Sequence, residues 1–275
     1  MYFNNFNDTS KVEIFIFDLE FVGNVDDLNT CFTWDLAAIN WDSKMTFQSY
    51  ILLPINNIPP PHPGCKNVTK NFLIENKARS FKNVIVDFLQ WVATQIVVKN
   101  KHSAVLISHN CFNSDKPLLE LEFTRYGIQA PNNIFFLDSL HLFRKKMTNL
   151  NSYSLKDLYQ STYNRPIYNA HSALSDVMAL DKLFDTLWWM NINIEGMIYP
   201  LYQTSLRVIT GVGEATERII VFQGITCLEH LIFESKPYLT QDNSFQKLCN
   251  FLIHRLNISY PLSCRIANGM FLRNK

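Results

Sequence analysis

The chain has 275 residues, enough for one large domain or for one domain of ordinary size with an appendage. Its composition, 47% hydrophobic with 21 Phe, 11 Tyr and 5 Trp, can fill a substantial core and excludes an intrinsically disordered protein. A net charge of +1 excludes a globally basic, histone-like protein, so any contact with nucleic acid must come from local patches.

The first strands of the fold are expected close together in the chain. A short apolar and aromatic run at 13–17 stops at carboxylates, as a buried strand does, and residues 34–40 and 45–53 continue as a meander. The Pro-rich segment 58–64 cannot form a helix, because proline fixes φ and lacks an N–H. It is expected to be a semi-rigid surface loop, with docking into a partner's groove as the alternative.

Helices and strands then alternate along the chain. Apolar residues at three- and four-residue spacing predict a helix that begins after Ser80. The remaining predicted elements are a strand at 104–108, a helix from Pro117 that ends before Gly127, a strand at 134–137, a helix start capped by Ser154, and a long helix at 170–190. This order predicts an α/β fold with a mixed sheet and helices on both faces.

The helical rhythm lapses near 191–202, in a stretch that contains Gly196 and Pro200. We therefore assign residues 1–195 to the α/β domain and residues 196–275 to a small all-α domain. Residues 201–275 carry 8 Lys/Arg and 5 Asp/Glu, so the second domain is the more basic part.

The cysteines and the absence of targeting signals bear on the compartment. The 6 cysteines are scattered without a C-x-x-C pair, which predicts buried thiols in a reducing compartment. The first residues lack the cationic and apolar stretches of a secretory signal, and no run of about 18 uninterrupted apolar residues is present. We expect an intracellular protein, in the nucleus or the cytoplasm, that does not act at a membrane.

Four carboxylates and a histidine are the candidate catalytic residues: Asp18, Glu20, Asp115, His171 and Asp176. The two-residue period of a strand points Asp18 and Glu20 to the same face, at the strand's end, and Asp115 follows the strand at 104–108. Five residues on a helix turn about 140° past a full turn. We therefore expect His171 in the lead-in to the last long helix and Asp176 in its first turns.

This set of side chains predicts a metal centre. Adjacent like charges are costly without a cation to share, and hard oxygen ligands without cysteine select Mg²⁺ or Mn²⁺ over zinc. Two such ions can clamp the attacking and leaving oxygens of a phosphodiester. A histidine, with an ordinary pKa of about 6.5, can take the proton of the attacking water near neutral pH. The set therefore predicts phosphodiester hydrolysis.

Three segments resemble the motifs of the DEDDh 3′–5′ exonucleases: FDLE at 17–20, HNCFNSDKPLL at 109–119, and YSL at 153–155 leading to HSALSD at 171–176. The six-residue step from His109 to Asp115, followed by Pro-Leu-Leu, is similar to the three-prime repair exonucleases (the TREX family). The resemblance covers about 11–192 and implies an RNase H-like fold. It also implies two Mg²⁺ ions, with Mn²⁺ as a substitute, held by the four carboxylates, His171 as general base, and release of nucleoside 5′-monophosphates from a 3′ end.

Two positions depart from the family pattern. Val22 precedes Gly23 where the family usually has threonine, and Ser114 stands where it usually has an aromatic residue. Neither change removes a metal ligand, but both bear on how the terminal nucleotide is gripped. Within the matching motifs, Leu19, His109 and Asn110 are candidates for contacts with the nucleic acid.

We expect metal-dependent 3′–5′ hydrolysis of DNA, with a preference for single-stranded 3′ ends. One alternative is an exoribonuclease that trims RNA 3′ ends with the same centre, since the motifs do not distinguish sugars. Another is a non-catalytic nucleic-acid-binding or scaffold protein on the same fold. Whether the chain forms a homodimer is left open, because the resembling family dimerises while this sequence has no edge-strand signal that decides the matter.

The second predicted domain contains a segment, 206–220, that resembles a helix-hairpin-helix. Gly211 and Gly213, on either side of Val212, would permit a tight hairpin whose backbone N–H groups bind a phosphate. This predicts sequence-independent docking onto a nucleic-acid backbone. A protein-contact or packing module is equally compatible, because Glu214 and Glu217 stand where a phosphate binder prefers lysine.

Overall fold

The computed structural model divides the chain into two compact units, Met1–Leu201 and Tyr202–Lys275, and each is considered by itself. It describes residues 11–23, 30–55, 58, 68–148, 150–189, 198–200, 206–209, 212–223, 225, 228, 231, 234–235, 238 and 244–273. Residues 59–64 of the predicted Pro-rich loop lie outside this part.

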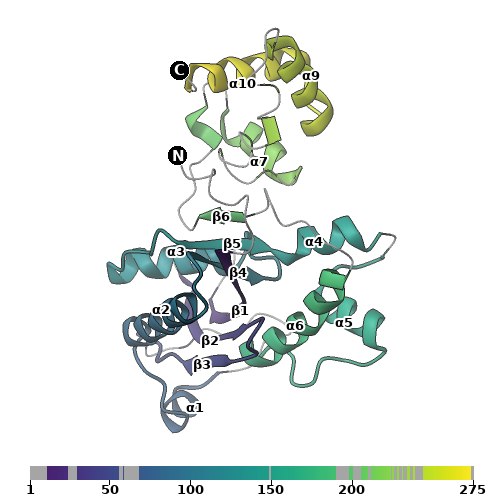
Figure 1. The fold of residues 1–275 in the computed structure, drawn as a ribbon. Helices are drawn as coiled ribbons and strands as arrows, with labels where there is room; N and C mark the ends of the chain where they lie inside the picture. The colour runs from purple at the N-terminus through teal and green to yellow at the C-terminus, as the bar shows by residue number, and fades with distance from the viewer. Residues whose placement is uncertain are drawn as a thin grey trace. The chain divides into compact units, whose positions relative to one another are not determined.

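The first unit is built on a six-stranded mixed sheet with the strand order β3-β2-β1-β4-β5-β6 (Figure 1). The strands are β1 (Val12–Val22), β2 (Phe32–Asn40), β3 (Thr46–Tyr50), β4 (Ser103–Ser108), β5 (Ile134–Asp138) and β6 (Ile198–Pro200). β1 pairs antiparallel with β2 and parallel with β4, so this central strand joins an antiparallel meander to a parallel half. The predicted mixed α/β sheet is confirmed.

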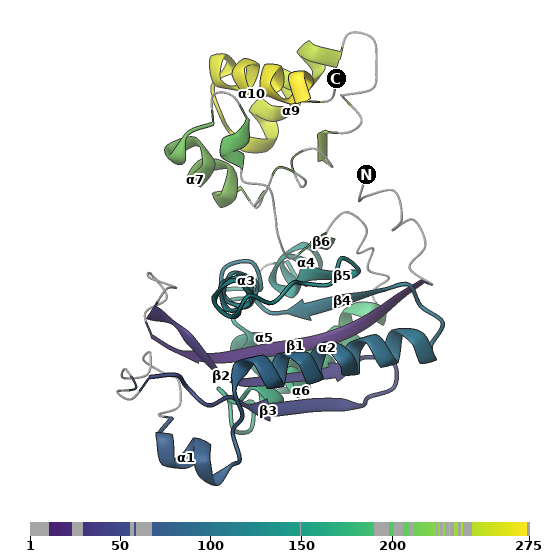
Figure 2. The ribbon, with the colours of Figure 1, turned by 90° about the vertical axis from the view of Figure 1, so that its left-hand side faces the viewer.

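Helices cover both faces of this sheet (Figure 2). The helices of the first unit are α1 (Lys70–Glu75), which packs in a small separate cluster, α2 (Phe81–Val98), α3 (Asp115–Tyr126), α4 (Ser139–Lys146), α5 (Leu155–Tyr163) and α6 (Ala173–Trp189). A first core cluster packs α2 and α3 against β1 residues such as Phe15 and Phe17. A second packs α4, α5 and α6 against the opposite face, through residues such as Ile16. Side chains of successive strand residues point to opposite faces, so one buried strand supplies both cores.

Helix α2 begins and packs as its sequence predicts. The Ser80 hydroxyl accepts a hydrogen bond from the Asn83 N–H, which caps the helix, and Val84, Phe88 and Val92 are buried against the sheet. The helix is long and apolar enough to cross a membrane, with 18 residues and a mean hydropathy of 1.2. Its buried face belongs to the first core cluster, however, as in the core helix of a globular unit.

Several boundaries differ from the sequence predictions. β1 continues to Val22 because β2 pairs with it antiparallel as far as the Val22–Phe32 pair. α3 begins at Asp115, two residues before Pro117, which fits because N–H groups of a first helical turn have no partner within the helix. The short elements α1, α4 and β6 were not predicted. Because β6 pairs with β5, the first unit extends to Leu201 rather than to residue 195.

The second unit is helical in its described part. Its elements are a 3-10 turn, η3 (Leu206–Val208), and the helices α7 (Glu214–Phe222), α9 (Ser244–Leu256) and α10 (Tyr260–Arg273). A separate core cluster joins these elements through fully buried residues such as Leu206, Ile220 and Leu252. This agrees with the predicted all-α part.

Candidate functional site

Asp18 and Glu20 lie on the central strand β1, with their side chains on the same face. Both follow Ile16, the last residue of β1 that pairs with β4. β1 therefore extends beyond β4 at the carboxyl ends of the parallel strands, the edge where open α/β sheets bind ligands. The prediction placed this pair at the end of the strand; it lies within a longer strand, because pairing with β2 holds the backbone extended.

Asp115 is the first residue of α3 and is 3% exposed. Its Oδ1 accepts a hydrogen bond from the Leu19 N–H at 3.0 Å, and its Oδ2 accepts from the hydroxyls of Ser108 at 3.0 Å and Ser114 at 2.8 Å. Burial raises the pKa of Asp115 to about 6, although these hydrogen bonds favour the ionised carboxylate and lower it. The bond to Leu19 joins the second motif to the first.

One of the two departures from the family pattern, Ser114, has a local explanation, as does Gly23, the glycine that follows the other departure, Val22. The Ser114 hydroxyl supplies one of the hydrogen bonds to Asp115, so serine at this position supports the neighbouring carboxylate. Gly23 has a φ of +111°, and a Cβ there would lie 2.4 Å from the Thr30 carbonyl oxygen. The chain therefore keeps glycine at the end of β1, where another segment approaches its backbone closely.

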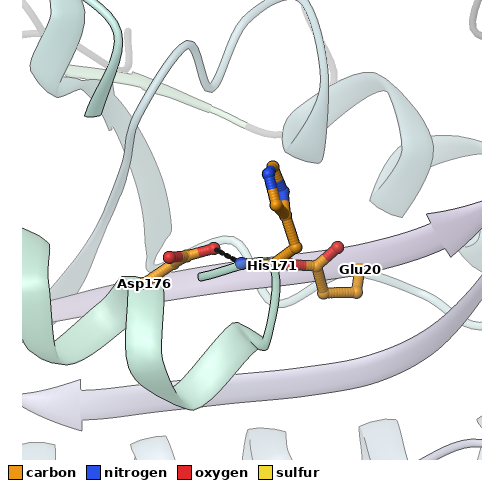
Figure 3. Close-up of side chains that lie close together, drawn as sticks. All are labelled: Glu20, His171 and Asp176. Carbon is orange, nitrogen blue, oxygen red and sulfur yellow. Dashed lines mark hydrogen bonds between the residues drawn. The ribbon is translucent and has the colours of Figure 1, made fainter. Parts of the chain in front are cut away.

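His171 and Asp176 lie at the start of α6, beside Glu20 (Figure 3). Asp176 is in the first turn, and its Oδ2 accepts a hydrogen bond from the His171 N–H at 3.0 Å. Ligand atoms of Glu20, His171 and Asp176 lie within 4.8 Å of one another. His171 is exposed in the lead-in to the helix, with a φ of +61°, a conformation that a residue with a side chain keeps only when its surroundings hold it.

Asp18 is the carboxylate whose pKa reflects the negative charges of the other site residues. Burial raises the pKa of Asp18 well above its ordinary value, and the negative charges of four neighbours raise it further: Asp115, Glu20, Asp176 and Asp35. The structure thus brings together all four predicted carboxylates, from β1, α3 and the start of α6, and places His171 at their rim.

Two buried aspartates near these residues were missed by the sequence reasoning. Asp35 on β2 is 0% exposed, and Asp138 at the end of β5 is 1% exposed. Asp138 accepts hydrogen bonds from the N–H groups of Asn110 at 2.9 Å and Leu140 at 2.9 Å, so it holds the turn after β4 and caps α4. Each stands as an acid in an apolar strand, which is the signal that could have marked it.

Leu19 and His109, two of the predicted nucleic-acid contacts, have structural roles within the first unit. The Leu19 side chain is 5% exposed and belongs to the first core cluster, while its N–H binds Asp115. The His109 Nε2–H donates to the Tyr153 carbonyl at 2.7 Å, and Nδ1 lies 3.0 Å from the Ser139 hydroxyl. Burial lowers the pKa of His109. Both side chains hold parts of the unit together, and their predicted contacts with a nucleic acid stay predictions.

Asn110 remains a candidate for a contact with the nucleic acid. It is half-buried in the turn after β4, with a φ of +61°. Its side-chain oxygen accepts a hydrogen bond from the Asn113 amide at 2.8 Å. The predicted contact stays a prediction.

The hairpin segment of the second unit is described only in part. Gly211 lies outside the described residues, and the Val212 side chain is 6% exposed, within the core of the unit. Gly213 has no left-handed backbone conformation and a Cβ there would meet no atom within 4 Å, so its conformation does not require glycine. Arg207 forms an ion pair with Glu217. The predicted phosphate contact is through backbone N–H groups, which the burial of the Val212 side chain does not test, so this contact and the helix-hairpin-helix stay predictions.

Comparison with protein families identifies the class of the first unit. A model of the exonuclease family RNase_T matches residues 15–184, more than half of the chain, from β1 to α6. The chain therefore belongs to this family of exonucleases. The matched region contains the four carboxylates and His171.

Individual relatives are more distant. Exonuclease DPD1, chloroplastic/mitochondrial, of Arabidopsis thaliana is 27% identical over 161 residues, which cover 56% of this chain and 48% of that protein. The chain thus spans about half the length of this relative. The nuclease domain of 3′hExo, a DEDDh family member solved with rAMP, has a TM-score of 0.50 and 13% identity, covering 65% of this chain and 92% of that chain. Cell-death related nuclease 4 has a TM-score of 0.45 and 17% identity, covering 65% and 64%.

The likeness to the 3′hExo domain shows the exonuclease fold, at a sequence identity of 13%. These matches do not single out the three-prime repair exonucleases within the DEDDh type. That finer assignment stays a prediction.

Proposed function

We propose that the chain is a divalent-metal-dependent 3′–5′ exonuclease that hydrolyses DNA, prefers single-stranded 3′ ends, and releases nucleoside 5′-monophosphates. The observation that carries this proposal is the convergence of carboxylates from three elements around Asp18, whose pKa they raise together with burial. Membership of an exonuclease family supports the same reaction class.

The donor set fits hard divalent cations. Asp18, Glu20, Asp115 and Asp176 offer carboxylate oxygens, and burial together with the neighbouring carboxylates raises the pKa of Asp18. A cation of high charge density bound among these carboxylates would offset their mutual repulsion. We propose two Mg²⁺ ions, with Mn²⁺ as a substitute. When bound, such ions activate a water molecule and stabilise negative charge on the phosphodiester.

His171 is the proposed general base. Its side chain is exposed at the rim of the cluster, while Asp176 holds its backbone N–H at 3.0 Å. A ring nitrogen can therefore accept the proton of the attacking water and pass it to solvent, whereas the backbone of the residue stays fixed. Asp115 contributes differently, because hydrogen bonds from Ser108 and Ser114 direct its oxygens and oppose the rise of its pKa.

A 5′-labelled single-stranded oligonucleotide tests the proposal. We expect a ladder of products that shorten by single nucleotides, that requires Mg²⁺ and that stops with EDTA. A 3′-terminal block on the same oligonucleotide should protect it if degradation starts at the 3′ end. An intact label with retained binding would instead support a non-catalytic nucleic-acid-binding protein.

Matched DNA and RNA strands decide the sugar preference in the same assay. We expect faster shortening of the DNA strand. Faster shortening of RNA would assign the chain to RNA trimming with the same catalytic residues.

A further inference from the structure

Asp35 is a fully buried carboxylate on β2 that lies outside the exonuclease motifs. The antiparallel register places it directly opposite Glu20 on β1. Like charges opposite each other on paired strands destabilise a sheet, and a buried carboxylate is costly unless it is hydrogen-bonded. Favourable contacts must therefore offset the placement of an acid at this position.

Groups on α6 and on β3 bind the Asp35 carboxylate. Its Oδ2 accepts a hydrogen bond from the backbone N–H of Ala173, the first residue of α6, at 3.2 Å. The Gln48 side chain on β3 donates to Oδ1 at 3.3 Å. The first N–H groups of a helix have no partner within the helix and carry partial positive charge, so they stabilise an anion. Asp35 thus ties the start of α6 to the sheet.

The hydrogen bond between Asp35 and the Ala173 N–H lies at the part of α6 that carries the site residues. Asp176 lies three residues after Ala173, and His171 lies two residues before it. The hydrogen bond between Asp176 and the His171 N–H couples the positions of these two residues. Because Asp35 also faces Glu20 across the strand pair, one side chain connects the β1 carboxylates with the α6 residues.

We infer that Asp35 is a positioning residue: it fixes the N-terminus of α6, and with it Asp176 and His171, in register with Glu20. It acts through its hydrogen bond to Ala173 and not by touching the substrate. Its effect on turnover rests on the proposed function, whereas its effect on the start of α6 does not.

Four variants of the full chain separate this role from others. Asp35→Ala removes the acceptor, and Asp35→Asn keeps an acceptor oxygen but removes the charge. Ala173→Pro removes the donor and leaves the charge, at a helix position where proline is well tolerated. Asp185→Ala is the matched control, because the Asp185 carboxylate also accepts a hydrogen bond that ties α6 to a neighbouring segment, from Trp41 Nε1 in the turn after β2 at 2.6 Å, but further along the helix.

Hydrogen exchange of peptides covering 174–180 gives a readout that needs no activity. We expect Asp35→Ala and Ala173→Pro to speed exchange there at least tenfold, while Asp35→Asn and Asp185→Ala stay near wild type. In the oligonucleotide assay, we expect the first two variants to lower kcat about 10–100-fold, as loss of an orienting partner does, with KM changed less than about twofold. Asp35→Asn should recover most of that rate.

Two results would overturn the inference. One is exchange at wild-type rates in 174–180 for a folded Asp35→Ala protein or for Ala173→Pro. The other is a kcat for Asp35→Asn as low as that of Asp35→Ala, since the charge would then matter and not the hydrogen bond. A wild-type chain that degrades no substrate would overturn the proposed function alone, because the exchange experiment still decides the role of Asp35.

Discussion

The two units of the chain differ in what they bury. Among the residues that the structure describes, the first unit buries eight Asp, Glu and Lys side chains: Glu13, Glu20, Asp35, Asp115, Lys116, Glu122, Asp138 and Asp181. The buried polar residues described in the second unit are Ser235 and Ser263, which are both uncharged. Burying a charge is unfavourable unless it is paired or hydrogen-bonded. The first unit therefore depends on hydrogen bonds and ion pairs for its buried charges, such as those of Glu13 with Asn40 and of Asp181 with Lys44, whereas the described part of the second unit has a mainly apolar core.

The largest expected effect is the loss of activity in Asp18→Asn. We expect turnover to fall by about 10³-fold or more, because several kcal/mol of charge stabilisation depends on the carboxylates that hold the cations. The oligonucleotide assay measures the rate, and a thermal melt of the same protein checks that it is folded. A rate within tenfold of wild type in a folded variant would remove Asp18 from the mechanism.

A smaller loss is expected when the general base is removed. His171→Ala should slow turnover by about 10²–10⁴-fold, the usual contribution of a positioned acid or base. The matched control is His254→Ala, which removes an exposed histidine of the second unit and should leave the rate unchanged. Equal rates for both variants would contradict the role assigned to His171.

Truncation of a buried leucine in each unit compares the two cores directly. Leu183 on α6 and Leu252 on α9 are both 0% exposed. Each substitution by alanine should cost about 2–5 kcal/mol in the unit that carries it. We expect Leu183→Ala to impair cleavage, because α6 also carries Asp176, and Leu252→Ala to lower the melting temperature of the second unit with cleavage at 25 °C unchanged.

The comparison is made by measuring the melting temperature and the rate of oligonucleotide cleavage for both variants. If Leu252→Ala loses cleavage as strongly as Leu183→Ala, the second unit is needed for the reaction. That result would favour the predicted docking of nucleic acid on the second unit.

The smallest expected effect is a change in melting temperature with pH and with bound metal. The pKa of Asp115 is raised to about 6 from 3.8, so between these pH values the native state holds its proton more tightly than the unfolded state. The stability of the metal-free protein must then fall as the pH rises through this window. In EDTA we expect a melting temperature about 2–6 °C higher at pH 5 than at pH 7, and Mn²⁺ at pH 7 should raise it again.

Asp115→Asn provides the control for this stability prediction. Without an ionisable group at this position, the variant should show a smaller difference between pH 5 and pH 7 and a weaker response to Mn²⁺, with the remaining pH difference due to Asp18, whose pKa is also raised. A wild-type melting temperature in EDTA that rises from pH 5 to pH 7 would show that the burial of this carboxylate does not control stability in the window.

The sequence by itself determined the local features of the first unit. Apolar spacing and serine caps predicted α2 and the start of α5, where the Ser154 hydroxyl accepts the Asp157 N–H at 3.2 Å. Helical periodicity separated His171, in the lead-in, from Asp176, in the first turn of α6. These predictions succeeded because caps and periodicity depend on residues within one or two turns.

Only the tertiary structure decided what Leu19 and Asp35 do. The motif offered Leu19 to the nucleic acid, but strand alternation buries its side chain, and Asp115 binds its N–H from 96 positions away. Asp35 acquires its neighbours from the β1–β2 register and from a helix that begins 138 positions later. Hydrogen bonds over such separations form only after strands and helices have packed, so no short-range pattern in the sequence specifies them.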